Sequence, residues 1–92
     1  MKEKFVKAIR EELAEKETIK INVSIECAEI NLQNCHDLEV EGIEETENTI
    51  ELATDILTFT VGKNYTVLSY NDCENEYIFE YANGVVITIT II

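Results

Sequence analysis

Cys35-His36-Asp37 has the residue types of a nucleophile, a base and an orienting acid. Adjacent residues of an extended chain point to opposite sides, so Cys35 and His36 would not readily share a proton. No glycine-rich elbow accompanies them. We therefore expect a turn with a half-buried thiol and a solvated imidazole here, and we predict that the chain is not an enzyme.

Two other groups of residues have metal-binding side chains without the usual spacing. Cys27, Cys35, Cys73 and His36 would be enough for zinc, but zinc modules usually bring their ligands in close pairs such as CxxC. The segment from Asn71 to Tyr77 resembles the start of a calcium loop, but it lacks the glycine and the final glutamate of such a loop. We expect no metal and no cofactor.

A dense acidic segment offers a different kind of site. The stretch DLEVEGIEE contains five carboxylates and no basic residue. On an extended strand, Asp37, Glu39 and Glu41 would line one side at a spacing of roughly 6.6–6.8 Å, which matches every second phosphate along a DNA strand with about 3.4 Å of rise per phosphate. The partner-binding residues that we predict are Asp37, Glu39, Glu41, Glu44, Glu45 and Glu47, with Glu74 and Glu76 as secondary candidates.

The charges are divided unevenly along the chain. Six of the seven basic residues lie in the first twenty positions, whereas the remaining 72 residues carry fourteen carboxylates and only Lys63. Direct binding of DNA or RNA is poorly supported, because it requires cations that neutralise phosphate. Such a surface fits a basic protein partner, although acidic surfaces also serve solubility alone.

The elements that must hold these residues indicate one domain over residues 1–92. Residues 1–17 have the four-residue apolar spacing of an amphipathic helix, with Phe5, Ile9 and Leu13 on one face. This face packs on the chain's own sheet or, alternatively, binds a partner. From Thr18 the period changes to two, so we expect an antiparallel sheet over residues 18–92.

The expected strands are short and separated by turns. The first is TIKINVSIEC, followed by a bulge or bend near Cys27–Glu29 that reverses the apolar parity. QNCHD is predicted as a turn, LEVEGI and TIELA as strands, and ILTFTV and YTVLSY as a hairpin joined by GKN. The predicted class is α+β, with the N-terminal helix packed on a strongly bent, mostly antiparallel sheet of about six or seven strands, like a partly open barrel.

The last hairpin, EYIFEYANGVVITITII, allows its register to be derived. A three-residue loop at residues 82–84 places Phe79 opposite Ile87 and Tyr77 opposite Ile89, and Gly84 supplies the left-handed residue that this loop needs. The final strand is so apolar that it must lie inside the sheet or in a dimer contact. The alternative function is therefore a structural or assembly protein that oligomerises through this strand or through the N-terminal helix, and a homodimer is possible.

The small size, the acidic curled sheet, the lack of catalytic motifs and a composition typical of AT-rich coding resemble phage-encoded inhibitors of bacterial defence, notably the type II anti-CRISPR proteins. The resemblance concerns these general properties over the whole chain, and no motif or residue is shared. It implies a non-catalytic DNA mimic that covers the basic groove of a CRISPR effector nuclease, in the cytoplasm of a bacterial host. No membrane span or signal peptide is expected.

Overall fold

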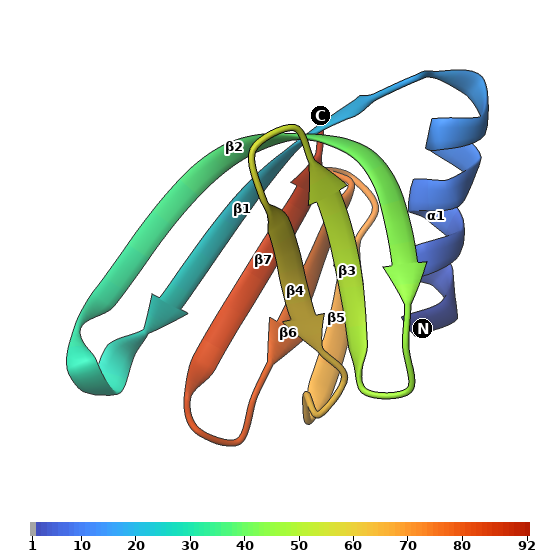
Figure 1. The fold of residues 1–92 in the computed structure, drawn as a ribbon. Coiled ribbons are helices and arrows are strands. Elements are labelled where there is room, and N and C mark those ends of the chain that lie inside the picture. The colour runs from blue at the N-terminus through green and yellow to red at the C-terminus, as the bar shows by residue number, and fades with distance from the viewer. Residues whose placement is uncertain (1) are drawn as a thin grey trace.

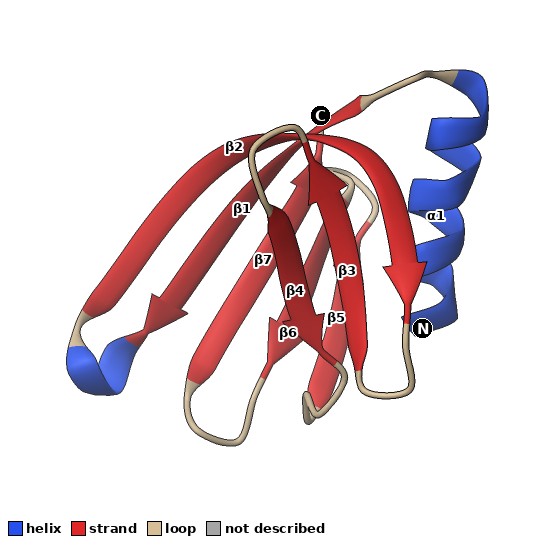
Figure 2. Cartoon of the chain, viewed as in Figure 1, coloured by secondary structure: helices blue, strands red, loops and turns tan. Residues whose placement is uncertain are grey.

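The computed structural model describes residues 2–92, with side chains from Lys4 onward. One helix precedes seven strands, and a single 3-10 turn joins the first two strands (Figure 2). The elements in chain order are α1 (Lys2–Glu15), β1 (Ile19–Cys27), η1 (Ala28–Ile30), β2 (Leu32–Glu45), β3 (Thr49–Thr54), β4 (Thr58–Gly62), β5 (Val67–Asn71), β6 (Glu76–Glu80) and β7 (Val85–Ile91). The predicted helix over 1–17 is confirmed apart from its ends, and Met1 lies outside the described residues.

All seven strands belong to one antiparallel sheet, in the order β4-β3-β2-β1-β7-β6-β5. The long strand β2 exchanges partners at Val40, since its first half pairs with β1 and its second half with β3. Figure 1 shows β2 arching over the molecule, so that β3 and β4 lie in front of β1, β7 and β6. The sheet is thus bent into two layers, which confirms the predicted α+β class.

The core lies between these layers and α1. Phe5, Val6 and Ile9 of the helix are buried, and the ring of Phe5 meets those of Tyr77 and Phe79 edge-on, at centroid distances of 5.0 and 5.3 Å. Edge-to-face contact is the geometry that aromatic quadrupoles favour. The apolar stripe of the helix therefore covers the chain's own sheet.

The register predicted for the last hairpin is confirmed. Phe79 lies opposite Ile87 and Tyr77 opposite Ile89. Gly84 has a φ of 88°, and its backbone N–H donates to the carbonyl of Tyr81. A side chain at this position would strain the backbone, which is why the loop requires glycine.

The bend expected near Cys27–Glu29 is confirmed in the form of the turn η1, which Asn31 ends with a left-handed φ of 52°. Two other local predictions are wrong. Residues 33–37, predicted as a turn, belong to β2, where pairing with β1 extends them. The hairpin predicted from 56–61 and 65–70 does not form, because β4 pairs with β3 while β5 pairs with β6 at the opposite edge of the sheet.

The apolar C-terminal strand β7 lies inside the sheet, between β1 and β6. Both of its edges are therefore occupied within the chain. Among the described residues, no helix has the length and the apolar character needed to cross a membrane.

Candidate partner-binding surface

The sheet has an inner face, toward α1 and the core, and an outer face turned away from them. Asp37 and Glu39 lie on the outer face of β2, because Leu38 and Val40 between and beside them are half-buried and buried. The alternation predicted for this part of the acidic segment is confirmed. Figure 1 shows that β2 is arched, so its outer face, to which these two residues belong, is the convex face of the strand.

Two neighbours on the β1 side hold these carboxylates in place. The side-chain amide of Asn22 donates to Asp37 at 2.8 Å, and the hydroxyl of Thr18 donates to Glu39 at 2.7 Å. Hydrogen bonds to an ionised acceptor are stronger than those between neutral groups. The two donors orient the carboxylates without neutralising their charge.

A register shift between Val40 and Gly42 makes Glu41 the extra residue of a bulge. The bulge reverses the alternation, so that Glu44 lies on the outer face, directly opposite Glu51 of β3. Two like charges opposite each other destabilise a sheet. We call the resulting surface the acidic ridge; its residues are Asp37, Glu39, Glu41, Glu44 and Glu51.

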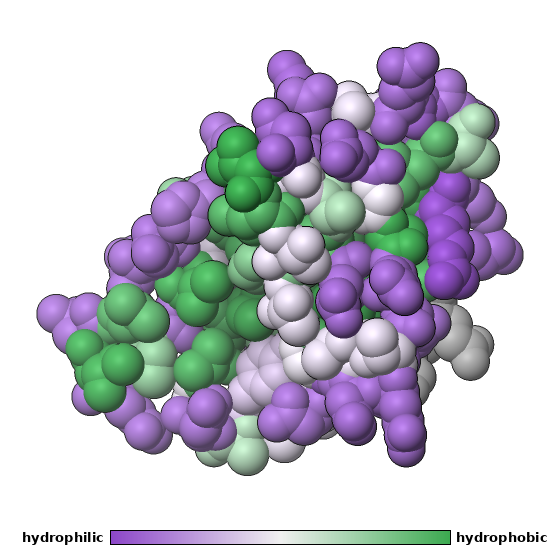
Figure 3. Space-filling model, viewed as in Figure 1, coloured by the Kyte–Doolittle hydropathy of each residue, from purple (hydrophilic) through white to green (hydrophobic). Residues whose placement is uncertain are grey.

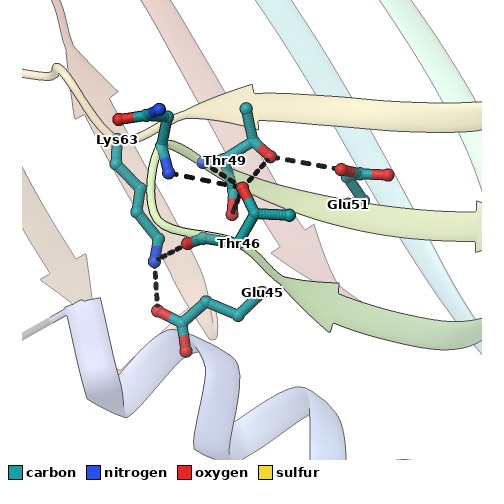
Figure 4. A network of polar contacts seen from close by, with 6 residues as sticks. Glu45, Thr46, Thr49, Glu51 and Lys63 are labelled. Atoms are coloured by element: carbon teal, nitrogen blue, oxygen red, sulfur yellow. Dashed lines mark hydrogen bonds and ion pairs between the residues drawn. The ribbon is translucent and has the colours of Figure 1, made fainter.

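Glu45 does not belong to this ridge. The bulge places it on the inner face with Ile50, and its carboxylate lies 2.7 Å from the ammonium nitrogen of Lys63 (Figure 4). Lys63 also donates to the carbonyl oxygen of Thr46. The side chains of Lys63 and Glu45 are only 13% and 29% exposed, so this ion pair acts within the fold.

Hydroxyl groups extend the same network to the ridge. The hydroxyl of Thr49 donates to Glu51 at 3.2 Å and lies 2.6 Å from the hydroxyl of Thr46 (Figure 4). Either hydroxyl can be the donor in this contact, and the hydroxyl of Thr46 also donates to the backbone carbonyl oxygen of Thr49 at 3.4 Å. The backbone N–H of Thr49 also donates to Thr46, and the turn between β2 and β3 is fixed by these bonds.

The remaining predicted residues lie apart from the ridge. Glu47 is exposed in the β2–β3 turn, and Glu74 is exposed in the turn between β5 and β6. Glu76 shares the outer face with Asp37, since Asn22 and Thr90 lie between them in one row across the strands. Three strand spacings separate Asp37 from Glu76, which is about 14 Å. The eight predicted residues thus form one ridge and several separate positions, not a single line.

One basic residue lies beside the ridge on β1. Lys20 lies opposite Glu39 in the register, and it is the one basic residue of β1. Within the described part of the chain, the ion pairs are Lys7–Glu11 and Lys16–Glu12 on the helix and Lys63–Glu45. None of them involves a carboxylate of the ridge.

The side chains considered for catalysis and for metal binding are dispersed. Cys35 lies on the outer face, where it exchanges hydrogen bonds with Asn22 at 3.3 and 3.5 Å, whereas His36 lies on the inner side with Val23. Cys27 is buried and Cys73 is exposed in a turn. Among the described residues, no group of three or more His, Cys, Asp or Glu side chains could hold a metal ion.

The eight predicted binding residues omit three outer-face carboxylates, one of which is Glu51 of the ridge, and the hydrogen-bond donors Thr18 and Asn22. Glu26 on β1 and Glu80 on β6 share the outer face, with Val86 of β7 between them. The signal was present in the alternation of IKINVSIEC, which assigns Asn22 and Glu26 to the face opposite the isoleucines.

Comparison of the chain with protein-family models, with curated proteins and with solved structures gives no match.

Proposed function

We propose that the chain is a non-catalytic inhibitor whose acidic ridge occupies the basic groove of a nucleic-acid-handling enzyme, acting as a DNA mimic. The observation that carries this proposal is the ridge itself, in which five carboxylates follow the convex side of β2 and β3 and form no ion pair among the described side chains. A convex anionic surface complements a concave cationic one.

The charge distribution supports this proposal. Lys63, the one basic residue beyond β1, is turned toward Glu45 and contributes little positive charge to the surface. Like charges at Glu44 and Glu51 oppose folding, and interspersed charges would keep the protein in solution without that cost. Electrostatic complementarity mainly speeds association and selects the partner.

The candidate partner is a CRISPR effector nuclease, the class implied by the resemblance to anti-CRISPR proteins. The inhibitor would act in the cytoplasm of a bacterial host, bind the protein and not the nucleic acid, and require no cofactor. Since β7 is paired on both sides, the alternative of assembly through the C-terminal strand has no free strand edge to use.

The test uses a guide-loaded type II effector nuclease and measures cleavage of its target DNA. The ridge variant is Glu41→Lys with Glu44→Lys, two exposed side chains for which the structure shows no hydrogen bond. The control is Glu15→Lys with Glu80→Lys, which changes the net charge equally at two exposed positions outside the ridge. We expect the wild type and the control to inhibit and the ridge variant to lose inhibition, with affinity that falls as salt is raised. No inhibition by the wild type, or equal inhibition by the ridge variant, would refute the proposal.

A further inference from the structure

The first half of β2 is a free strand edge. β1 pairs with Leu32–Val40 on one side, whereas β3 pairs only with Val40–Glu45 on the other. The side of Leu32–Glu39 that faces away from β1 therefore has no neighbouring strand among the described residues. The second half of β2 also has a side without a neighbouring strand, but α1 lies next to that side. The first half is therefore the uncovered part of β2 (Figure 1).

Among the features by which proteins usually prevent edge pairing, this edge has the charged side chains of Asp37 and Glu39 but not the others. Its sequence, LQNCHDLE, has no lysine and no proline, and the bulge of β2 comes only after it. The other two edges, β4 and β5, are strands of five residues each. The β2 edge is longer and exposes a row of backbone N–H and C=O groups to another strand.

The segment Leu32–Leu38 has the same order of apolar and polar residues on the two sides of Cys35. A two-fold axis through Cys35, perpendicular to the sheet, would pair this edge antiparallel with the same edge of a second copy. Leu32 would then lie opposite Leu38, Gln33 opposite Asp37, Asn34 opposite His36, and Cys35 opposite its own copy. Each pair joins residues on the same face, and no like charges meet. An axis through His36 would instead place Leu38 opposite Asn34 and Cys35 opposite Asp37.

Exposed apolar side chains flank both ends of this edge. Ile30 and Leu32, at the turn between β1 and β2, are 71% and 43% exposed, and Ile56 and Leu57, in the turn between β3 and β4, are 76% and 46% exposed. Figure 3 shows apolar side chains over both of these turns on one side of the molecule. Because Thr54 of β3 pairs with Val40, the β3–β4 turn begins next to the point where β2 of a paired second copy would begin.

We infer that the chain forms a two-fold symmetric dimer through the Leu32–Leu38 edge of β2, with the η1 turn of each copy against the β3–β4 turn of the other. The sheets would join into one, and four large apolar side chains of each copy would lose solvent exposure. Asp37 belongs both to this edge and to the acidic ridge, but the inference is argued from the free strand edge and the exposed apolar side chains and does not rest on the proposed function. The formal charge of −12 on each copy opposes dimerisation and must be screened.

The first experiment is sedimentation equilibrium of the full chain at low and high salt. A dimer that strengthens as salt is raised is expected, whereas binding to a basic partner weakens under the same change. A monomer at every protein and salt concentration would overturn the inference.

Substitution of Gln33 tests the register, because this residue would face Asp37 of the second copy twice in each dimer. Gln33→Lys should lower the dimer Kd and Gln33→Glu should raise it, each by roughly two- to thirty-fold, from the usual strength of charged cross-strand pairs. Asn48→Lys and Asn48→Glu make the same charge changes in the exposed β2–β3 turn and serve as controls. Equal effects at positions 33 and 48 would refute this register.

A cysteine crosslink tests the position of the axis. In a Cys73→Ser background, Cys35 is the one exposed thiol of the described chain. A short bismaleimide, which adds one thiol to each of its two alkenes, should then yield a covalent dimer. A Cys35→Ser variant that keeps Cys73 should crosslink far less but still sediment as a dimer. Equal crosslinking through Cys73, or a Cys35→Ser protein that is monomeric, would overturn the arrangement.

Discussion

The hydroxyl of Tyr81 donates a hydrogen bond of 2.8 Å to the carbonyl oxygen of Gly62. Gly62 ends β4, whereas Tyr81 follows β6, and these strands lie five positions apart in the sheet order. The bond therefore joins the two layers across the open side of the bent sheet. The ring of Tyr81 also lies edge-on to Tyr65, with a centroid distance of 6.4 Å.

Tyr81→Phe removes this bond and keeps the ring. We expect the free energy of unfolding to fall by about 1–2 kcal/mol, because the carbonyl of Gly62 loses its partner in a half-buried position. Urea unfolding at neutral pH measures the change. Tyr70→Phe, which removes a longer bond of 3.2 Å to Asn75, should cost less and serves as the control. Equal stability of Tyr81→Phe and wild type would show that the tie between the layers does not contribute.

Alkaline pH should unfold the protein through its buried phenols. Burial raises the pKa of Tyr81 to about 12, with a smaller contribution from Tyr65, and burial also raises the pKa values of Tyr65 and Tyr77 from 10.0. Because the folded state holds these protons more tightly, their contribution to stability is complete below pH 10 and is lost as the pH rises toward 12. Tyrosinate absorbance and unfolding should change together in this window. Titration of Tyr65, Tyr77 and Tyr81 near 10 in the folded protein would contradict the prediction.

Lys63→Met should destabilise the fold much more than a similar change on the helix. The substitution leaves the partly buried carboxylate of Glu45 without its 2.7 Å partner, and we expect a loss of about 1–3 kcal/mol after allowance for its residual exposure. Lys7→Met is the matched control, since its 3.9 Å pair with Glu11 is 76% and 67% exposed and should contribute under about 0.5 kcal/mol. Chemical denaturation of both variants gives the comparison, and equal losses would argue against a structural role for Lys63.

The parts of the fold that could be predicted are those in which a local pattern determines the result. The alternation of Ile19, Ile21 and Val23 marks a strand with one buried face, and β1 has the predicted bounds at Cys27. The last hairpin could be aligned because only one loop length puts apolar residues on one face, and Gly84 fits that loop.

The parts that could not be predicted depend on contacts distant in sequence. The residues of QNCHD are typical of turns, and pairing with β1 makes them a strand. GKN looks like a hairpin loop, yet β4 and β5 take partners on opposite sides of the sheet. The bulge that turns Glu45 inward could have been detected in the sequence. Val40 and Ile43 are three residues apart, so they cannot both lie on the inner face of a strand with a regular period of two.

The opposed carboxylates of Glu44 and Glu51 predict a response to salt and to charge reversal. Glu51→Lys would replace a repulsive cross-strand pair by an attractive one but would lose the hydrogen bond from Thr49, and we expect a net gain of up to about 1 kcal/mol in the free energy of unfolding. Wild-type stability should rise with added salt, and this rise should be smaller in the variant because less repulsion remains to be screened. Glu80→Lys changes the net charge equally but lies opposite Val67 and Val86, so it controls for the overall charge. Urea unfolding at two salt concentrations measures all three proteins. If Glu80→Lys stabilises as much as Glu51→Lys, the effect comes from net charge, and the local opposition of Glu44 and Glu51 costs the fold nothing.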